Sequence, residues 1–406
     1  MTGSSDRVIL RAIWPVILAA IISLLPFTIY STFVVTIADD AGADEAVVGT
    51  LRGLGGLAAL IVGVALAPLI ARWSASRVTA SALGVLSVAC LIGTAGDIGG
   101  ATAVPALIVF CIGIGAATAM LTPALLRIAT SAFAESGDSG RAATLVTATQ
   151  SLAAVLAAPV IGVIGLWQGW RGALWVAGAL AAVAGIVFLR RRRTDAGTPS
   201  PLGYGESFRH LRRRRDLLAL IGIASLRTTS FMGYLAFLAV RFHEQHGLDA
   251  VTFTLVWTLS GASFFAGNYL AGRWARAAGA RRALLIGGLI AAFAAVLVVF
   301  LTNSLVVALV ATAVMGFGHA VVAAQVTTLI AQRGGDLTTP AFSINAAGMS
   351  LGVFAGAFLG GVGLALAGSV GLAIALAAPT LVALTLIRPA LSRTTGRISV
   401  RTSDEL

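Results

Sequence analysis

Long apolar runs fill most of this 406-residue chain, and short polar intervals separate them. A helix needs about 20 apolar residues to cross a lipid bilayer. Twelve runs have about this length, so the pattern predicts an all-α membrane protein with twelve transmembrane helices. The runs are 12–37, 46–70, 78–95, 104–128, 142–164, 172–189, 217–240, 251–271, 283–301, 305–331, 342–364 and 369–387.

The one long polar interval, residues 189–217, lies almost at the middle of the chain and reads LRRRRTDAGTPSPLGYGESFRHLRRRRDL. Two blocks of four arginines flank a segment whose Gly, Pro and Ser residues are typical of a loop. We therefore expect an N-terminal six-helix bundle (1–189), a basic linker (190–216), a C-terminal six-helix bundle (217–388) and a tail (389–406).

The arginines predict how the chain is oriented. Short arginine-rich loops resist translocation, so the linker should stay in the cytoplasm, and an even number of helices then places both termini there. On that side the prediction puts 24 of the 28 basic residues, all of which are arginines. The opposite loops hold mainly acids, among them Asp39, Asp40, Asp44 and Glu45. This asymmetry predicts a multi-pass protein of a bacterial inner membrane.

Composition narrows the class further. The chain is 58% hydrophobic and only 11% charged, whereas soluble domains have about 25% charged residues. The net charge of +12 lies in loops beside apolar runs, so we expect a lipid bilayer rather than nucleic acid as the partner. Cys90 and Cys111 both lie in apolar runs, which argues against a disulfide framework or a metal site. No nucleotide-binding or catalytic pattern is visible, so we expect a monomeric non-enzyme without a cofactor.

The two halves repeat each other. The triplet Ala71-Arg72-Trp73 returns as Gly272-Arg273-Trp274, with the arginines 201 residues apart. Two further pairs recur at nearly the same spacing, which favours two six-helix units in parallel orientation. These pairs are Gly113-x-Gly115 with Gly316-x-Gly318, and Gly162 with Gly361.

Three stretches resemble the major facilitator superfamily. Residues 268–282, NYLAGRWARAAGARR, are similar to the G-x-L-a-D-R-x-G-R-R loop of that family, with Gly272 at the aspartate position. Residues 154–162, AVLAAPVIG, resemble the exporters' G-x-x-x-G-P-x-x-G pattern with alanines for two glycines, and 350–361 resemble drug:proton antiporters and sugar-efflux permeases. The resemblance implies two six-helix bundles, gating roles for Arg72, Arg273, Pro159 and Gly162, and no catalysis.

Three ionisable residues fall inside predicted helices, where a charge costs several kcal/mol and is a functional candidate. They are Arg227, His319 and Arg52, and none of the sixteen acids is predicted near mid-membrane. We expect His319 to carry protons because histidine titrates near neutral pH, with Asp39 or Asp40 beside Arg52 as the second choice. Structural roles stay open: a packed neutral His319, an Arg227 tied to helix carbonyls, or an Arg52 salt bridge to either aspartate.

A central cavity between the halves should be lined by aromatic, methionine and sparse polar side chains, which suit an amphiphilic organic ligand. We expect Arg227 and His319 to face it. The other candidates are Phe27, Tyr30, Phe33, Met120, Thr122, Gln150, Phe231, Tyr234, Trp257, Phe264, Gln325, Asn345 and Met349. We assign substrate binding to Arg227 and Arg52 together with six of these candidates: Tyr30, Phe231, Tyr234, Trp257, Gln325 and Asn345.

The function expected first is a secondary active transporter that works by alternating access and exports a small organic or drug-like compound in exchange for protons. The alternative is uptake or exchange of a small organic anion that Arg227 and Arg52 recognise. A third hypothesis is a transporter-like sensor or scaffold, for which we see no soluble relay domain. A carboxylate within reach of Arg227 would count against the anion hypothesis.

Overall fold

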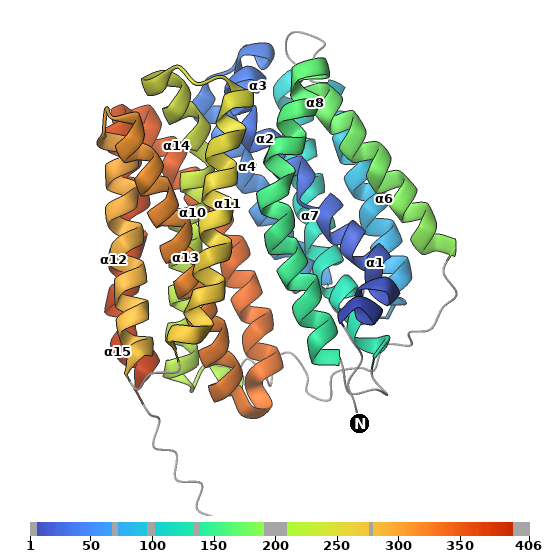
Figure 1. The fold of residues 1–406 in the computed structure, drawn as a ribbon, viewed down its shortest axis with the longest axis vertical. Coiled ribbons are helices and arrows are strands. Elements are labelled where there is room, and N and C mark those ends of the chain that lie inside the picture. Colours follow the sequence, from blue (N-terminus) through green and yellow to red (C-terminus); the bar gives the residue numbers. More distant parts are fainter. Residues whose placement is uncertain are drawn as a thin grey trace, which may run out of the picture.

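The computed structural model describes residues 6–66, 72–95, 102–133, 139–190, 209–275 and 279–392. These residues form helices and contain no strand, which confirms the predicted all-α class. Figure 1 shows the helices of the two halves standing side by side. Large apolar side chains such as Trp167 (84% exposed) and Val310 (59%) lie on the outside, as expected for surfaces that face lipid.

The N-terminal half begins with a helical pass that is broken twice, where the sequence predicted one continuous helix. Pro26 explains the first break, because proline lacks an N–H and its ring clashes with the carbonyl four residues earlier, and the first helix ends at Ile22. The elements are α1 (Asp6–Ile22), α2 (Leu25–Thr32), α3 (Val34–Ala41), α4 (Glu45–Ile61), the π-helical turn η1 (Val62–Leu66), α6 (Ala75–Thr94), α7 (Ala103–Ser131) and α8 (Ser139–Arg190).

The C-terminal half has the same order of long helices. Its first helix is unbroken, unlike the first pass of the N-terminal half. The elements are α10 (Arg215–His246), α11 (Ala250–Trp274), α12 (Ala280–Leu301), α13 (Leu305–Gly334), the 3-10 turn η3 (Gly335–Leu337), α14 (Thr338–Thr385) and α15 (Ile387–Leu391).

Two of the helices, α8 and α14, each contain a break at a glycine. Gly169 (φ 62°) and Gly368 (φ 56°) adopt left-handed backbone conformations that other residues rarely tolerate. A Cβ on Gly363 would lie 2.6 Å from the Gly371 carbonyl oxygen, so α14 folds back on itself at the break. The two arms of α8 likewise diverge from their break in Figure 1. Each of these helices therefore supplies two segments.

Nine stretches of the described residues are long and apolar enough to cross a membrane. Leu305–Thr385 holds more than one pass, and Pro159–Arg190 contains the end of one pass before the break at Gly169 and a further pass after it. The multi-pass membrane fold is thereby established, and the count of twelve stays a prediction.

The molecule has two chemically different ends. We call the end that carries Asp39, Asp40, Glu45, Glu244 and Asp249 the acidic end. We call the opposite end, where α4 and α11 finish and α10 begins, the arginine end; its arginines include Arg72, Arg127, Arg214, Arg273 and Arg333.

Glycines at repeated positions allow the helices within each half to pack closely. A Cβ on Gly115 of α7 would collide with the Gly55 backbone of α4, and a Cβ on Gly316 of α13 would lie 2.6 Å from the Ser260 carbonyl oxygen of α11. Gly115 and Gly316 are 201 residues apart, as are the two arginines of the repeated triplets. The sequence pattern paired Gly113 with Gly316. The packing instead makes Gly115, two residues later, the counterpart of Gly316.

The two halves meet through α4 with α14 and through α8 with α11. The repeated glycines Gly162 and Gly361 both lie at these contacts: a Cβ on Gly162 would lie 2.8 Å from Thr254 Oγ1, and one on Gly361 would lie 3.1 Å from the Ala46 carbonyl oxygen. Small residues at such surfaces let helix backbones approach closely.

The halves are closed against each other at the acidic end. Close approaches of α4 to α14 run from Ala46 to Gly56, whereas Ile61, Val64 and Leu66 further along are 53%, 55% and 43% exposed. The larger hydrophobic core joins both halves. A smaller core at the arginine end contains only residues of the C-terminal half.

Candidate substrate site

Arg227 and His319 meet in the C-terminal half. Arg227 lies near the middle of α10 and His319 near the middle of α13, and each is 6% exposed. The Arg227 Nη1 atom lies 2.5 Å from Nε2 and 3.3 Å from Nδ1 of His319. Sequence spacing placed both residues at similar depth, but only the fold shows that they touch. Both are buried, so neither faces lipid; that they face a cavity between the halves stays a prediction.

The chemistry of the two side chains determines which of them donates the hydrogen bond. A guanidinium can only donate hydrogen bonds, so the imidazole nitrogen that receives Arg227 must be the unprotonated one. His319 is therefore a neutral acceptor in this arrangement. Among the described residues no helix carbonyl accepts from Arg227, whose Nη1 donates instead to the unprotonated nitrogen of His319.

Arg227 has no counter-ion in the part of the chain that the structure describes. Among the described residues, no carboxylate pairs with it, and its Nε atom has no hydrogen-bond partner. A buried charge without a partner costs several kcal/mol. The site therefore has unused capacity to bind a negative charge or a strong acceptor.

Aromatic rings cover the Arg227–His319 pair. Phe231, one turn after Arg227 on α10, stacks on the His319 ring with centroids 3.8 Å apart and an interplanar angle of 16°. Phe264 of α11 lies 5.9 Å from His319 and 6.3 Å from Phe231. The sequence assigned Phe231 to substrate binding, and the structure places it against the pair. A polar centre beside flat apolar rings is the usual composition of a small-molecule site.

Tyr234, one turn further along α10, is fully buried. Its hydroxyl donates to Thr312 Oγ1 at 2.9 Å, and its ring meets Phe300 edge-on at 5.9 Å. This substrate-binding candidate therefore packs in the core of the C-terminal half, with its polar atom already satisfied.

Arg52 approaches α10 from the other half. Its Nη1 donates to the Met232 carbonyl oxygen at 3.3 Å, and its guanidinium lies 5.7 Å from the centre of the Phe27 ring, within the range of a cation–π contact. Met232 is five residues after Arg227, or about 7.5 Å along the helix axis. The two arginines thus reach the same stretch of α10 from opposite halves.

The expected salt bridge between Arg52 and Asp39 or Asp40 is absent. Asp40 instead pairs with Arg171 at 3.0 Å and accepts a hydrogen bond from Trp170 Nε1 at 2.8 Å. Asp39 and Asp40 lie near Arg52 in the sequence, but both are in the last turn of α3, where Asp40 contacts α8 instead. The proton-coupling roles assigned to Asp39 and Asp40 therefore lose the partner that motivated them and stay untested predictions.

The remaining substrate-binding candidates make contacts elsewhere. Tyr30 donates to the Val48 carbonyl oxygen at 2.7 Å, Gln325 Nε2 donates to the Ala271 carbonyl oxygen at 3.2 Å, and Asn345 Nδ2 lies 3.5 Å from Met349 Sδ. Trp257 packs against Phe253, and its Nε1 has no partner. None of these contacts reaches Arg227 or His319. The side chain of Gln150 lies outside the described residues.

The candidate gating residues lie at two levels. Arg72 and Arg273 are exposed at the arginine end, and Arg273 lies 4.4 Å above the Tyr269 ring. Pro159 and Gly162 lie on α8, where Gly162 contacts the other half. Ala71 lies outside the described residues. Gating by these residues stays a prediction.

One arginine that the sequence assigned to an outer loop is structural. Arg241 is 7% exposed and donates to the carbonyl oxygens of Val299 at 3.3 Å and Thr302 at 2.7 Å, at the end of α12. Basic side chains often satisfy the last carbonyls of a helix. Its position near a helix end was the only signal available in the sequence.

Solved transporters share this fold. A bacterial homologue of the human lysosomal transporter Spinster, in an inward-facing and unoccupied conformation, is 16% identical with a TM-score of 0.78 over 95% of this chain and 98% of that chain. The nucleoside transporter NupG, in a mutant form, is 13% identical with a TM-score of 0.75 over 93% and 100%. At such identities the likeness concerns the fold alone.

The sequence itself settles the family. No curated protein matches the chain. Residues 16–336 match the family model described as Major Facilitator Superfamily, which covers well over half of the chain. This protein therefore belongs to the Major Facilitator Superfamily and is a membrane transporter rather than an enzyme.

Proposed function

We propose that this protein is a secondary active transporter for small organic molecules that carry an anionic group or a strong hydrogen-bond acceptor. The observation that carries the proposal is Arg227, which is buried, has no carboxylate partner among the described residues and holds a free Nε donor. A cargo that accepts from Arg227 offsets the cost of its buried charge. This reverses the order of hypotheses that the sequence favoured.

Arg52 supports the same conclusion from the other half. It too is buried without an ion pair among the described residues, and it reaches α10 next to Phe231. Two uncompensated positive charges near one stretch of helix favour an anion over a cation. The aromatic rings around His319 supply the apolar part of the binding surface.

Movement of the cargo follows the alternating-access scheme, in which two halves rock around a central site. Contacts through small residues at Gly162 and Gly361 support such motion. We place the arginine end in the cytoplasm, by the positive-inside rule, with both termini on that side of the cell membrane and one chain as the working unit.

Proton-coupled efflux of drug-like compounds is the second candidate function. The stacked rings of Phe231, Phe264 and His319 favour it, because flat aromatic surfaces also bind neutral or cationic drugs. In this version His319 takes up the exchanged proton. Protonation would remove the acceptor that Arg227 uses, so cargo and proton would compete at the pair.

A thermal-shift screen of the purified protein tests the proposal. Organic anions, neutral compounds and drug-like cations should be compared at equal concentration across pH 5 to 8, because a ligand stabilises the fold by RT ln(1 + [L]/Kd). We expect the anions to raise Tm most and His319→Gln to flatten the pH dependence of that rise. Stabilisation by cations alone would contradict the anion proposal and favour drug efflux.

A further inference from the structure

Exposed arginines gather around the start of α10 at the arginine end. Before α10 the chain makes a tight turn, in which the Arg213 N–H donates to the His210 carbonyl oxygen at 3.2 Å. The next N–H, that of Arg214, donates to the Leu211 carbonyl oxygen at 2.9 Å. Four side chains of this turn and of the first helical residue are exposed: those of Arg209, Arg212, Arg213 and Arg215. Positive charge therefore stands where a membrane-spanning helix begins.

The turn is anchored to the C-terminal half. Leu211 is fully buried in the smaller hydrophobic core. Arg214 donates from Nε and Nη2 to the two carboxylate oxygens of Asp216, each at 3.0 Å, and its Nη2 also donates to the Arg333 carbonyl oxygen at 2.9 Å. Arg333 in turn donates to the Ala390 carbonyl oxygen of α15. These bonds hold the backbone that carries the exposed arginines beside the ends of α13 and α15.

Two more elements add arginines to this surface. The short helix α15 packs against α10 and α12; it buries Ile387 and Ala390 and exposes Arg388. Arg282 is exposed in the first turn of α12, and Figure 1 shows α15 at the lower end of that helix. We call the six exposed side chains the arginine platform: Arg209, Arg212, Arg213, Arg215, Arg282 and Arg388.

The charge of the platform is not neutralised by the protein. None of its six side chains has a hydrogen bond or an ion pair within the described residues. Asp216 is 3% exposed and already pairs with Arg214, and Asp336 on η3 is the other acid whose side chain is described at this end. The positive ends of the α10 and α12 dipoles face the same side. This face therefore attracts anions.

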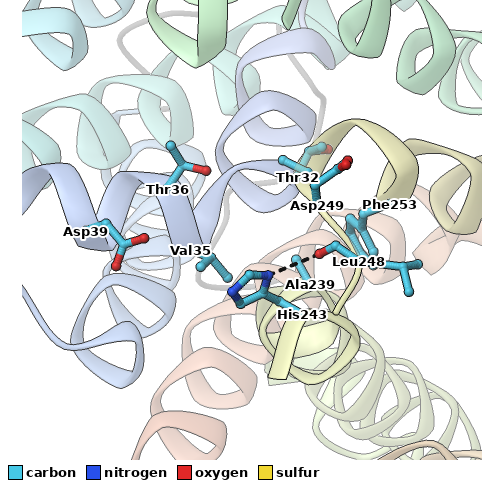
Figure 2. Close-up of a pocket in the computed structure, with 10 residues that line it drawn as sticks. Thr32, Val35, Thr36, Asp39, Ala239, His243, Leu248, Asp249 and Phe253 are labelled. Atoms are coloured by element: carbon cyan, nitrogen blue, oxygen red, sulfur yellow. Dashed lines mark hydrogen bonds between the residues drawn. The ribbon is translucent and has the colours of Figure 1, made fainter. Parts of the chain in front are cut away.

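The acidic end has the opposite chemistry. Figure 2 shows Asp39 and Asp249 beside a pocket of about 130 Å³ between the halves. The arginines described near this end are engaged within the protein: Arg171 pairs with Asp40, and Arg241 donates to carbonyl oxygens at the end of α12. An attraction for anions at the molecular surface therefore belongs to the arginine end.

Apolar surface continues from the platform along the helices. Leu381 and Val382, near the end of α14 and shortly before Arg388, are 47% and 51% exposed. Ile290, about two turns beyond Arg282 on α12, is 50% exposed. A partner that uses both surfaces carries a negative headgroup and apolar chains. A soluble phosphate would use the arginines alone.

We propose that the arginine platform binds anionic phospholipids, with the phosphate headgroups on the arginines and the acyl chains on the apolar surface of α12 and α14. A guanidinium donates two parallel hydrogen bonds to a phosphate, and basic clusters next to a membrane-spanning helix attract anionic lipids. A bound headgroup also screens the repulsion among the six arginines, so anionic lipid stabilises this end of the C-terminal half.

This surface is separate from the candidate substrate site. Arg227 lies twelve residues after Arg215, or about 18 Å further along α10. Lipid binding at the platform therefore holds whatever the cargo is, and the experiment needs no cargo.

Native mass spectrometry of the full-length protein in detergent tests the proposal. Phosphatidylglycerol and phosphatidylcholine with identical acyl chains are titrated separately, and the bound lipids are counted. We expect a lower Kd for phosphatidylglycerol, by about fivefold for each arginine that the headgroup engages. Phosphatidylglycerol should also raise Tm, and less so as salt rises from about 0.05 to 0.5 M. Glycerol 1-phosphate, which has no acyl chains, should leave Tm unchanged.

Three triple variants locate the effect. Gln at positions 209, 212 and 213 should raise the Kd for phosphatidylglycerol by up to about 100-fold and leave that for phosphatidylcholine unchanged. Lys at the same positions keeps the charge and should keep most of the preference. The matched control, Arg11→Gln with Arg72→Gln and Arg190→Gln, removes three exposed arginines of the N-terminal half and should change Kd by less than about threefold, because distant exposed charges are screened.

The proposal fails if the wild-type protein binds both lipids equally, or if the control loses as much affinity as the platform variant with Gln. A rise in Tm with glycerol 1-phosphate as large as that with phosphatidylglycerol would also overturn it, because the occupant would then be a soluble anion.

Discussion

The two halves of this transporter share a frame but differ in the chemistry placed on it. An offset of 201 residues relates Arg72 to Arg273 and Gly115 to Gly316. The same offset aligns Tyr30 with Phe231, so an aromatic ring is repeated. One turn before that ring the two halves differ, because Arg227 stands 201 residues after Pro26. Gly115 and Gly316 pack helices at a repeated position, whereas the buried charge of Arg227 has no counterpart at Pro26.

The partner of Arg227 follows the same pattern. His319 lies 201 residues after Thr118, whose hydroxyl donates to the Ile114 carbonyl oxygen of its own helix at 2.9 Å. In the N-terminal half the side chain at this position thus makes its hydrogen bond within its own helix. In the C-terminal half it holds an imidazole that binds a side chain of another helix.

The difference also affects helix continuity. Proline breaks the first pass of the N-terminal half, whereas α10 runs without interruption and is more deeply buried than the stretch Val8–Thr32. A continuous, buried helix holds Arg227 and Phe231 at fixed spacing. A duplicated arrangement of helices can therefore acquire one asymmetric site when two aligned pairs of positions differ, here Pro26 with Arg227 and Thr118 with His319.

The largest expected effect is on cargo affinity. Arg227→Gln should raise the Kd for the organic anion selected by the thermal-shift screen by about 30-fold or more, because removing one partner of a buried charged contact costs about 2–5 kcal/mol. Thr118→Val, the change at the position that aligns with His319, should leave Kd within about threefold. Isothermal titration of the detergent-solubilised variants measures both values.

Equal losses in the two variants would mean that the halves bind cargo symmetrically. That result would contradict the asymmetric site. Circular dichroism and size-exclusion profiles like those of the wild type would show that a change in Kd does not arise from misfolding.

The second effect concerns the shared frame. Gly115→Val and Gly316→Val should each lower stability by about 1–3 kcal/mol, because a side chain there meets the backbone of Gly55 or Ser260. Gly84→Val is the matched control, since a Cβ at Gly84 meets nothing within 4 Å. Thermal unfolding measures all three. A stable Gly316→Val protein beside an unstable Gly115→Val protein would show that the repeat is not a packing repeat.

Much of the frame could be predicted from the sequence. Apolar runs located the long helices, and the spacing of arginines and glycines revealed the duplication, because lipid and close packing impose strong local requirements on residue type. The depth of Arg227 and His319 also followed from their positions in the runs. Pro26 is itself a signal for the broken first pass, and positive-φ glycines at 169 and 368 mark the reversals.

The pairing of side chains could not be predicted in the same way. Asp40 and Arg52 were expected to pair because both lie near one end, yet Asp40 binds Arg171 and Arg52 turns to a carbonyl of α10. Which polar groups meet depends on helix rotation and tilt, and an apolar run does not encode these angles. The contact of Arg227 with His319, 92 positions apart, depends on the same angles.

The smallest expected effect tests whether the N-terminal half contributes to the site at all. Arg52→Gln removes a hydrogen bond to Met232 and a cation–π contact with Phe27, and each is worth about 1 kcal/mol. Because Arg52 lies across the contact between the halves, we expect a loss in anion affinity of about fivefold, well below the effect of Arg227→Gln. Titration at low and high ionic strength measures it, with Arg273→Gln as a control of equal charge change at the exposed arginine end. If Arg52→Gln weakens binding as much as Arg227→Gln does, the charge from each half is equally engaged by the cargo, and the asymmetry between the halves lies in packing rather than in recognition.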